Sequence, residues 1–236
     1  MWRRYFSSEL AYGAVAVLPA VLYCLIWHRI DEDFPSWDPI AYWIGAAKIS
    51  ESLVQNDFWR WPEIFYFMRA FRFTLLPALL VPLWTISKNN IDIAAALFSG
   101  TVALVNGILL YQLLRMQLTR TIAVLCTLLI SLQISILGVE LEAFGENILL
   151  IGLMGSCLFF LKRKSNRDLW ISGTFFGLAF TARPTEAIYY FIAGFLLLFW
   201  QTQASDRRQL LSDLFKPVFF GSLLGFLWWI GFWSQT

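Results

Sequence analysis

The stretch that decides the fold is Ile91–Leu114, IDIAAALFSGTVALVNGILLYQLL, in which Asp92 is the one charged residue. About 20 consecutive apolar residues suffice for a helix that crosses the roughly 30 Å hydrocarbon core of a bilayer. The chain of 236 residues is 58% hydrophobic and 14% charged, with a mean hydropathy of +0.62, whereas an ordinary soluble domain is about 25% charged. A bilayer accepts only helices and closed barrels, and long apolar runs without strict alternation exclude a barrel. We therefore predict an all-α, polytopic transmembrane helical bundle.

Further apolar runs flank this stretch, and together they predict about seven spans in a single transmembrane domain over residues 1–236. The expected spans are 11–30, 91–114, 122–137, 148–161, 169–182, 187–200 and 218–233. Residues 31–72 instead form a long outer-face loop rich in tryptophan, a headgroup-level residue, so we expect interfacial helices there. Residues 74–86 are too short to cross and contain Pro77 and Pro82, which favours a re-entrant segment.

The basic residues of the turns predict the orientation, because cytoplasmic loops carry an excess of lysine and arginine. Arg3 and Arg4 precede the first span, so we expect the N-terminus in the cytoplasm. If residues 74–86 do not cross, all three basic turns are cytoplasmic as well. These turns hold Arg115, Arg120, Lys162, Arg163, Lys164, Arg167, Arg207 and Arg208. We predict a multi-pass integral membrane protein, of the plasma or inner membrane if the source is bacterial.

The residue composition limits which metal sites and disulfide bonds the chain can contain. Cys24, Cys126 and Cys157 lie within apolar runs without pairing or metal-ligand spacing, so no disulfide framework is implied. His28 is the single histidine of the chain, which excludes a histidine-rich metal site. The acidic run Asp31–Asp33 is either a solvated span end or a weak site for a divalent cation, since hard cations bind oxygen ligands. No nucleic-acid partner is expected.

Asp38 is the first candidate for chemistry, in the stretch Ser36–Ile49, SWDPIAYWIGAAKI. Pro39 is favoured at the first position of a helix. After it, apolar residues recur every three or four positions with polar residues between them, which predicts an amphipathic helix at the membrane surface. The expected apolar face comprises Ile40, Trp43, Ile44 and Ala47, and the polar side Lys48, Glu51, Ser52 and Gln55. Asp38 is then either the N-cap of this helix or a general base that takes a proton from an acceptor hydroxyl.

Two more candidates lie at span ends on the same predicted face. Glu146 begins a span after Glu140 and Glu142. A carboxylate at this position either faces a cavity or a partner, or is there only because the helix dipole stabilises negative charge at the start of a helix. Arg183 interrupts an apolar stretch, and its forked donors suit an anionic phosphate. The alternative is an interfacial arginine that pairs with Glu186.

Assembled, these residues resemble the GT-C superfamily of integral-membrane glycosyltransferases over most of the chain. The resemblance rests on Asp38 after the first span, the arginine-rich segment RAFRFTLLPALL at 69–80, Glu146 at a span start, and GTFFGLAFTARP at 173–184. It implies transfer of a sugar, of the hexosyl or mannosyl kind, from a polyprenyl-phosphate carrier to an acceptor hydroxyl. The reaction would take place at the outer, periplasmic or lumenal face.

The resemblance also implies roles for single residues. Asp38 would be the catalytic base, and Glu146 would act with Glu140 or Glu142 in an acidic second outer loop. The carrier phosphate would lie near Arg183 and Arg72. Partners would be membrane lipid and the polyprenyl-phosphate-linked sugar as donor. No cofactor or metal would be required, with a divalent cation as the alternative.

The number of spans departs from the resemblance, because GT-C enzymes usually have more of them. About seven spans resemble their N-terminal module, so the chain is expected to be a fragment, a minimal version, or a subunit whose partner supplies further helices. A non-catalytic accessory or assembly protein of the same fold is the alternative function. A small-molecule transporter is less favoured, because its acids or broken helices would lie at midplane in paired halves.

Overall fold

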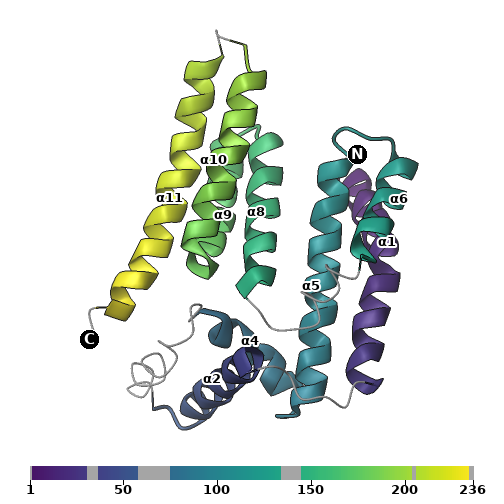
Figure 1. The fold of residues 1–236 in the computed structure, drawn as a ribbon, viewed down its shortest axis with the longest axis vertical. Helices are drawn as coiled ribbons and strands as arrows, with labels where there is room; N and C mark the ends of the chain where they lie inside the picture. The colour runs from purple at the N-terminus through teal and green to yellow at the C-terminus, as the bar shows by residue number, and fades with distance from the viewer. Residues whose placement is uncertain (1, 31–36, 58–74, 134–144, 204–205, 234–236) are drawn as a thin grey trace. The chain divides into compact units, whose positions relative to one another are not determined.

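The structure, a computed structural model, describes residues 2–30, 37–57, 75–133, 145–203 and 206–233. Within these ranges it contains nine helices and no strand (Figure 1). The predicted all-α fold class is therefore confirmed, and each predicted span overlaps a helix. Among the described residues, two helical segments are long and apolar enough to cross a membrane by themselves, Glu9–Trp27 and Ile91–Leu114. The count of about seven spans stays a prediction.

The chain divides into two compact units, Met1–Asn147 and Ile148–Thr236. Unit 1 contains α1 (Trp2–Ile30), α2 (Trp37–Val54), α4 (Leu75–Ile86), α5 (Ile91–Leu114) and α6 (Arg120–Ser131). Unit 2 contains α8 (Gly145–Leu161), whose first turn lies on the boundary, α9 (Asn166–Ala182), α10 (Pro184–Gln201) and α11 (Arg207–Trp233). The expectation of a single transmembrane domain stays a prediction.

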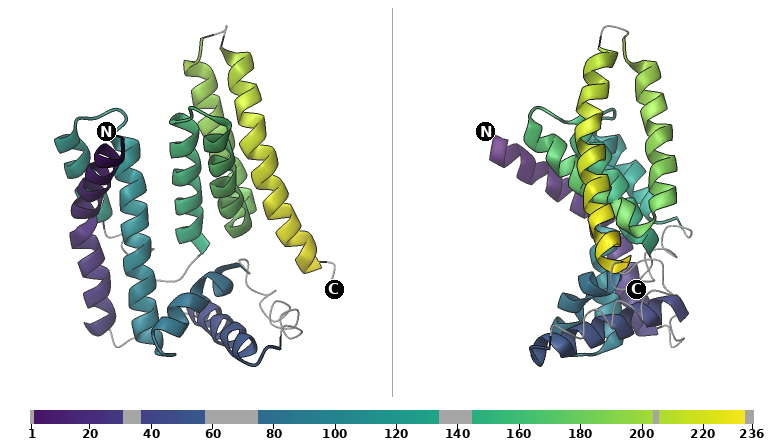
Figure 2. Two further views of the ribbon diagram at one scale, coloured as in Figure 1. Left: turned by 180° about the vertical axis from the view of Figure 1, so that it is seen from behind. Right: turned by 90° about the vertical axis from the view of Figure 1, so that its left-hand side faces the viewer.

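In unit 1, α1 and α5 lie side by side and run in opposite directions (Figure 2). Gly107 of α5 faces Val17 of α1 so closely that a Cβ at the glycine would collide with the valine side chain. Closer to the start of α5, a Cβ at Gly100 would lie 3.2 Å from Leu25 Cδ2. The small side chains buried in this seam are Ala20, Cys24 and Ala103. Small residues at a helix contact let the two helices approach closely, as in membrane bundles.

The antiparallel direction of α1 and α5 bears on the predicted topology. If both helices cross the membrane, α5 begins on the side where α1 ends. This is the arrangement expected if residues 74–86 do not cross, whereas a crossing there would make α1 and α5 parallel. The 12 residues of α4 extend over about 18 Å, well short of the roughly 30 Å core. The re-entrant character of α4 stays a prediction.

The helix predicted after Asp38 is present as α2, but its buried face differs from the prediction. Trp43 is buried as expected, with its ring centroid 6.4 Å from that of Trp84 in α4 and 6.3 Å from that of Phe98 in α5. Ile44, assigned to the apolar face, is exposed, and Ser52, assigned to the polar side, is buried. The Ser52 hydroxyl donates to the carbonyl three residues earlier at 2.9 Å, which makes its burial acceptable. The buried face follows the position of α4, which periodicity alone did not supply.

In unit 2, α9 and α11 run parallel and meet through glycines. Gly173 and Gly177 lie four residues apart and hence on one face of α9. A Cβ at Gly221 of α11 would lie 2.5 Å from Gly173 O and 2.8 Å from Gly177 N. α8 runs antiparallel to α9, and a Cβ at Gly152 would lie 2.6 Å from the backbone nitrogen of Ala179. α9 therefore lies backbone to backbone against both α8 and α11.

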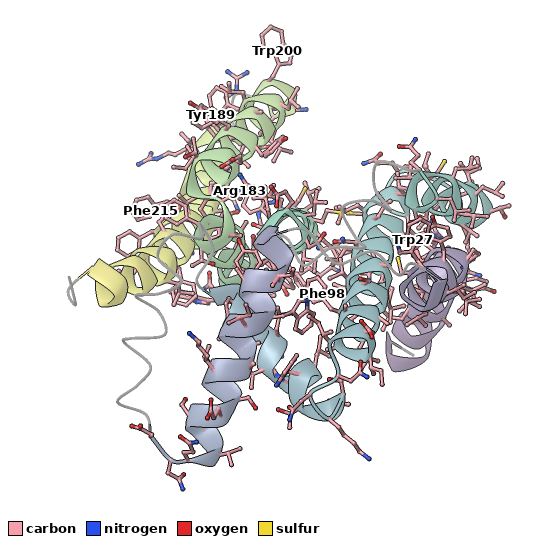
Figure 3. The ribbon with its side chains drawn as sticks, turned by 60° about the horizontal axis from the view of Figure 1, so that its bottom comes forward. Trp27, Phe98, Arg183, Tyr189, Trp200 and Phe215 are labelled. Carbon is pink, nitrogen blue, oxygen red and sulfur yellow. The ribbon has the colours of Figure 1, made fainter. Side chains whose placement is uncertain are left out.

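α10 packs on one side and leaves the other side open. Phe191 and Phe195 pack against a buried cluster at the end of the unit where α8 ends and α9 and α11 begin. On the opposite side, Tyr189 and Trp200 are 68% and 86% exposed, and Figure 3 shows both projecting from α10. Large exposed apolar side chains along a helix fit a surface that meets hydrocarbon rather than water.

Candidate functional site

Asp38 is the second residue of α2, which begins at Trp37. The prediction that Pro39 begins the helix is thus off by two residues, within the usual uncertainty of a helix boundary. An aspartate in the first turn still interacts favourably with the helix dipole. The side chain of Asp38 lies outside the described part of the structure, so both of its predicted roles stay predictions. The structure does show that α2 is held against α4 and α5 through the buried side chain of Trp43.

Glu146 and Arg183 lie toward the same end of the antiparallel pair formed by α8 and α9. Glu146 is the second residue of α8, in its first turn, and its side chain is half-buried. Arg183 is the residue between the end of α9 and the start of α10. Because α8 is one continuous helix that runs antiparallel to α9, its start and the end of α9 lie at one end of the pair. The remaining predicted site residues, Glu140, Glu142 and Arg72, lie outside the described residues.

Arg183 holds the sharp connection between two helices. Its backbone leaves the helical region, at φ −148° and ψ 84°, and Pro184 then starts α10 at a position where proline costs no hydrogen bond. The Nη1 atom of Arg183 lies 3.2 Å from Oε1 of Glu186, and the two side chains are 24% and 41% exposed. The ion pair that we held as the alternative for Arg183 is therefore present. An ion pair exposed to this extent is weak, on the order of 0–1 kcal/mol.

The opposite end of unit 2 carries the basic turns. Arg163, after α8, pairs with Asp213 of α11 at 3.0 Å, and Lys216 of α11 donates to Asn166 of α9 at 3.0 Å. The turn before α9 and the start of α11 are therefore at one end, as the predicted topology requires, and Arg183 is at the other. The basic turn before α9 and Arg183 are thus separated by the length of α9.

Sequence reasoning missed a charged cluster in unit 1. Glu9 lies in the apolar part of α1 and is buried, and it accepts a hydrogen bond from the Tyr111 hydroxyl at 2.6 Å. Arg120 donates to the same carboxylate through Nη2 at 2.6 Å and Nε at 3.2 Å, and Arg115 Nε lies 3.5 Å away. The available signal was a carboxylate directly before an apolar run together with two arginines around one short turn. Charged groups in such a run are expected to pair.

Among the described residues, no group of three or more histidine, cysteine, aspartate or glutamate side chains is arranged to hold a metal ion. The acidic run Asp31–Asp33, which the sequence offered as a weak cation site, lies outside those residues. Cys24, Cys126 and Cys157 form no disulfide bond within the described part of the chain.

Residues 75–230 match the family described as dolichyl-phosphate-mannose-protein mannosyltransferase, over more than half of the chain. The chain belongs to this mannosyltransferase family. Membership confirms the resemblance to the GT-C superfamily and indicates a membrane glycosyltransferase of that type. A comparison with curated proteins and one with solved structures gave no match.

The mannosyltransferase match separates the candidate residues into two groups. Glu146 and Arg183 lie inside the matched range, as do Glu140 and Glu142. Asp38 and Arg72 precede it. The first group is therefore part of the region that carries the family relationship, while the proposed base comes from the segment in front of it.

Proposed function

We propose that the chain transfers a sugar, by its family a mannose, from a polyprenyl-phosphate carrier to an acceptor hydroxyl at the outer face of the membrane. The observation that carries the proposal is the mannosyltransferase match over residues 75–230. It is supported by the arrangement in unit 2, where Arg183 lies at the end opposite to the basic turns. Under the positive-inside rule, that end is the outer one.

The transfer reaction requires one positively charged group beside the leaving phosphate and one base for the acceptor hydroxyl. The acceptor oxygen attacks the anomeric carbon, the bond from that carbon to the carrier phosphate breaks, and the phosphate leaves with the electron pair. Arg183 supplies positive charge beside the leaving phosphate, where such charge stabilises the transition state. The acceptor loses its proton as it attacks, and we assign that proton to the carboxylate of Asp38.

The remaining acids are assigned supporting roles. Glu146 is proposed to orient the acceptor or the sugar together with Glu140 or Glu142. Arg72 is proposed to contact the carrier phosphate together with Arg183. No metal is required in this scheme, so transfer is expected to persist after treatment with EDTA.

The test of the base is Asp38→Asn, assayed for transfer from a synthetic polyprenyl-phosphate mannose in detergent or in vesicles. Loss of a general base lowers turnover by about 100-fold or more. Glu51→Gln is the matched control, because Glu51 is an exposed acid on the same helix whose side chain accepts from Gln55 at 3.2 Å. Equal activity of Asp38→Asn and Glu51→Gln would remove Asp38 from the mechanism.

A second comparison tests Arg183 against its ion-pair partner. Arg183→Gln and Glu186→Gln both break the same pair, so a purely structural role predicts similar effects from both. A role at the phosphate predicts that Arg183→Gln alone raises the KM for the donor. Failure of the unaltered chain to transfer any sugar, with donor and acceptor supplied, would favour a non-catalytic accessory protein of the same fold.

A further inference from the structure

The charged cluster of unit 1 carries more positive than negative charge. We call Glu9, Tyr12, Tyr111, Arg115 and Arg120 the α5–α6 arginine cluster. Glu9 contributes one carboxylate and the two arginines contribute two guanidinium groups. Residues 112–122, which form the α5–α6 turn and its flanks, contain no aspartate or glutamate. Among the described residues, the cluster therefore carries one net positive charge.

The geometry puts that excess charge on the outside of the cluster. The side chain of Glu9 is 11% exposed, whereas those of Arg115 and Arg120 are 32% and 40% exposed. Arg120 uses Nε and Nη2 on Glu9, and Arg115 uses Nη1 on the carbonyl of Leu118 at 3.0 Å. Within the described residues, Nη1 of Arg120 and Nη2 of Arg115 take part in none of the hydrogen bonds that hold the cluster. These donors belong to rigidly held guanidinium groups.

If α5 crosses the membrane, the cluster lies at the depth of the lipid headgroups. Arg115 directly follows the 24 residues of α5, a helix of about 36 Å that covers the roughly 30 Å hydrocarbon core. Tyr12 lies under Arg120, with the guanidinium carbon 4.5 Å from the ring centroid, and it is 42% exposed. Tyrosine with one apolar and one polar end is typical of the membrane–water boundary. The available anions at that boundary are the phosphates of lipids.

From these observations we propose that the α5–α6 arginine cluster binds the phosphate group of an anionic lipid through Arg115 and Arg120. Guanidinium forks match phosphate oxygens in geometry as well as in charge. Glu9 and Tyr111 position the arginines, since they orient Arg120 without reaching the surface themselves. The proposal is independent of the transfer reaction, because its residues lie at the end of α1 and α5 that carries the N-terminus.

The experiment is a titration of the detergent-solubilised full chain with lipid, followed by native mass spectrometry. The probes are anionic phosphatidylglycerol, zwitterionic phosphatidylcholine, and farnesyl phosphate as a short polyprenyl phosphate. We expect the two anionic lipids to bind and phosphatidylcholine to bind less. Stronger binding of phosphatidylglycerol identifies a glycerophospholipid as the natural source, and stronger binding of farnesyl phosphate identifies a polyprenyl phosphate.

The variant is Arg115→Gln, which leaves Glu9 paired with Arg120. It should weaken binding of the anionic lipid about fivefold, the effect of one basic residue near a charged membrane surface. Lys88→Gln is the matched control, since it removes one exposed positive charge at the other end of α5. Equal weakening by both variants, or none by Arg115→Gln, would overturn the proposal.

A measurement on the unaltered chain covers the case in which Arg115→Gln does not fold. Phenylglyoxal modifies accessible guanidinium groups, and mass spectrometry locates the modified residues. Phosphatidylglycerol should slow the modification of Arg115 and Arg120 while leaving Arg208, in the first turn of α11, as reactive as in phosphatidylcholine. Equal rates at Arg115 in both lipids would contradict a bound phosphate.

Discussion

The α1–α5 seam of unit 1 and the α9–α11 seam of unit 2 both contain glycines at the helix contact, but the atoms that lie against these glycines differ. In the α1–α5 seam, each glycine makes room for a side chain, such as Val17 at Gly107 or Leu25 at Gly100. In the α9–α11 seam, Gly221 makes room for the backbone of α9. A side chain can change rotamer or shift, whereas a helix backbone moves only as a whole. The first seam is adjustable and carries a charged cluster at one end, while the second depends on contact along its length.

The largest effect is expected where backbone meets backbone. Gly221→Ala would place a methyl group 2.5 Å from Gly173 O, so α9 and α11 must separate, at about 3 kcal/mol of unfolding free energy. Gly100→Ala is the matched change in the other seam, where Leu25 can yield, and we expect a net effect below about 1 kcal/mol. Thermal unfolding in detergent compares them, with hydrogen exchange of the α9 and α11 peptides as the local readout.

Gly194→Ala is the control for the intrinsic helix effect, because a Cβ there would meet nothing within 4 Å. It should stabilise the protein by up to about 1 kcal/mol, the difference in helix propensity between alanine and glycine. The comparison of the seams fails if Gly221→Ala unfolds at the same temperature as Gly194→Ala.

The next effect concerns the charged cluster. Glu9→Gln leaves two arginines without their carboxylate and weakens the bonds from Tyr111 and Arg120. Removal of one partner of a buried pair costs about 3–5 kcal/mol, and the exposure of the arginines reduces this to about 2 kcal/mol. Cys24 is a reporter, because it is completely buried in the α1–α5 seam.

The measurement is the rate of thiol labelling at Cys24, with Cys157 of unit 2 as the internal control. We expect Glu9→Gln to raise the Cys24 rate and leave the Cys157 rate unchanged. An unchanged Cys24 rate would mean that the apolar seam holds α1 without help from the cluster.

The smallest effect comes from the polar cap of α9. Asp168 accepts hydrogen bonds from the backbone N–H of Lys164 at 2.8 Å and of Ser165 at 3.0 Å, and these hold the pKa of its carboxyl below the ordinary value. A lowered pKa means stability that is complete above about pH 4, the unfolded value, and is lost as the pH falls through the folded one. Asp168→Asn should remove that part of the acid dependence.

The check is thermal unfolding between pH 6 and pH 2 for the unaltered chain and for Asp168→Asn. The two curves should converge toward low pH, where the aspartate is protonated. Ser165→Ala, which breaks the same capping box, should cost about 1 kcal/mol near neutral pH. Parallel curves over the whole range would show that the cap does not depend on the charge of Asp168.

The outline of the fold was predictable because apolar runs report burial in lipid without reference to tertiary contacts. The predicted span 91–114 coincides with α5, and the segment 74–86 is a helix too short to cross. The face of α2 was predicted incorrectly at Ile44 and Ser52, since both depend on where α4 lies. Glu146 and Arg183 were selected as candidates from their position at span ends, and their roles stay predictions. The cluster at Glu9 was missed because its arginine partners are more than 100 residues away along the chain.

The sequence by itself determined the all-α class, the places of the long apolar helices and the family, because composition and local order are sufficient for each of these. The tertiary structure alone decided which helices are neighbours, in which direction they run, and which charges share one end of a bundle. Those features depend on contacts between residues far apart in the chain. Glycine at position 221 and glutamate at position 9 acquire their importance only from what lies against them.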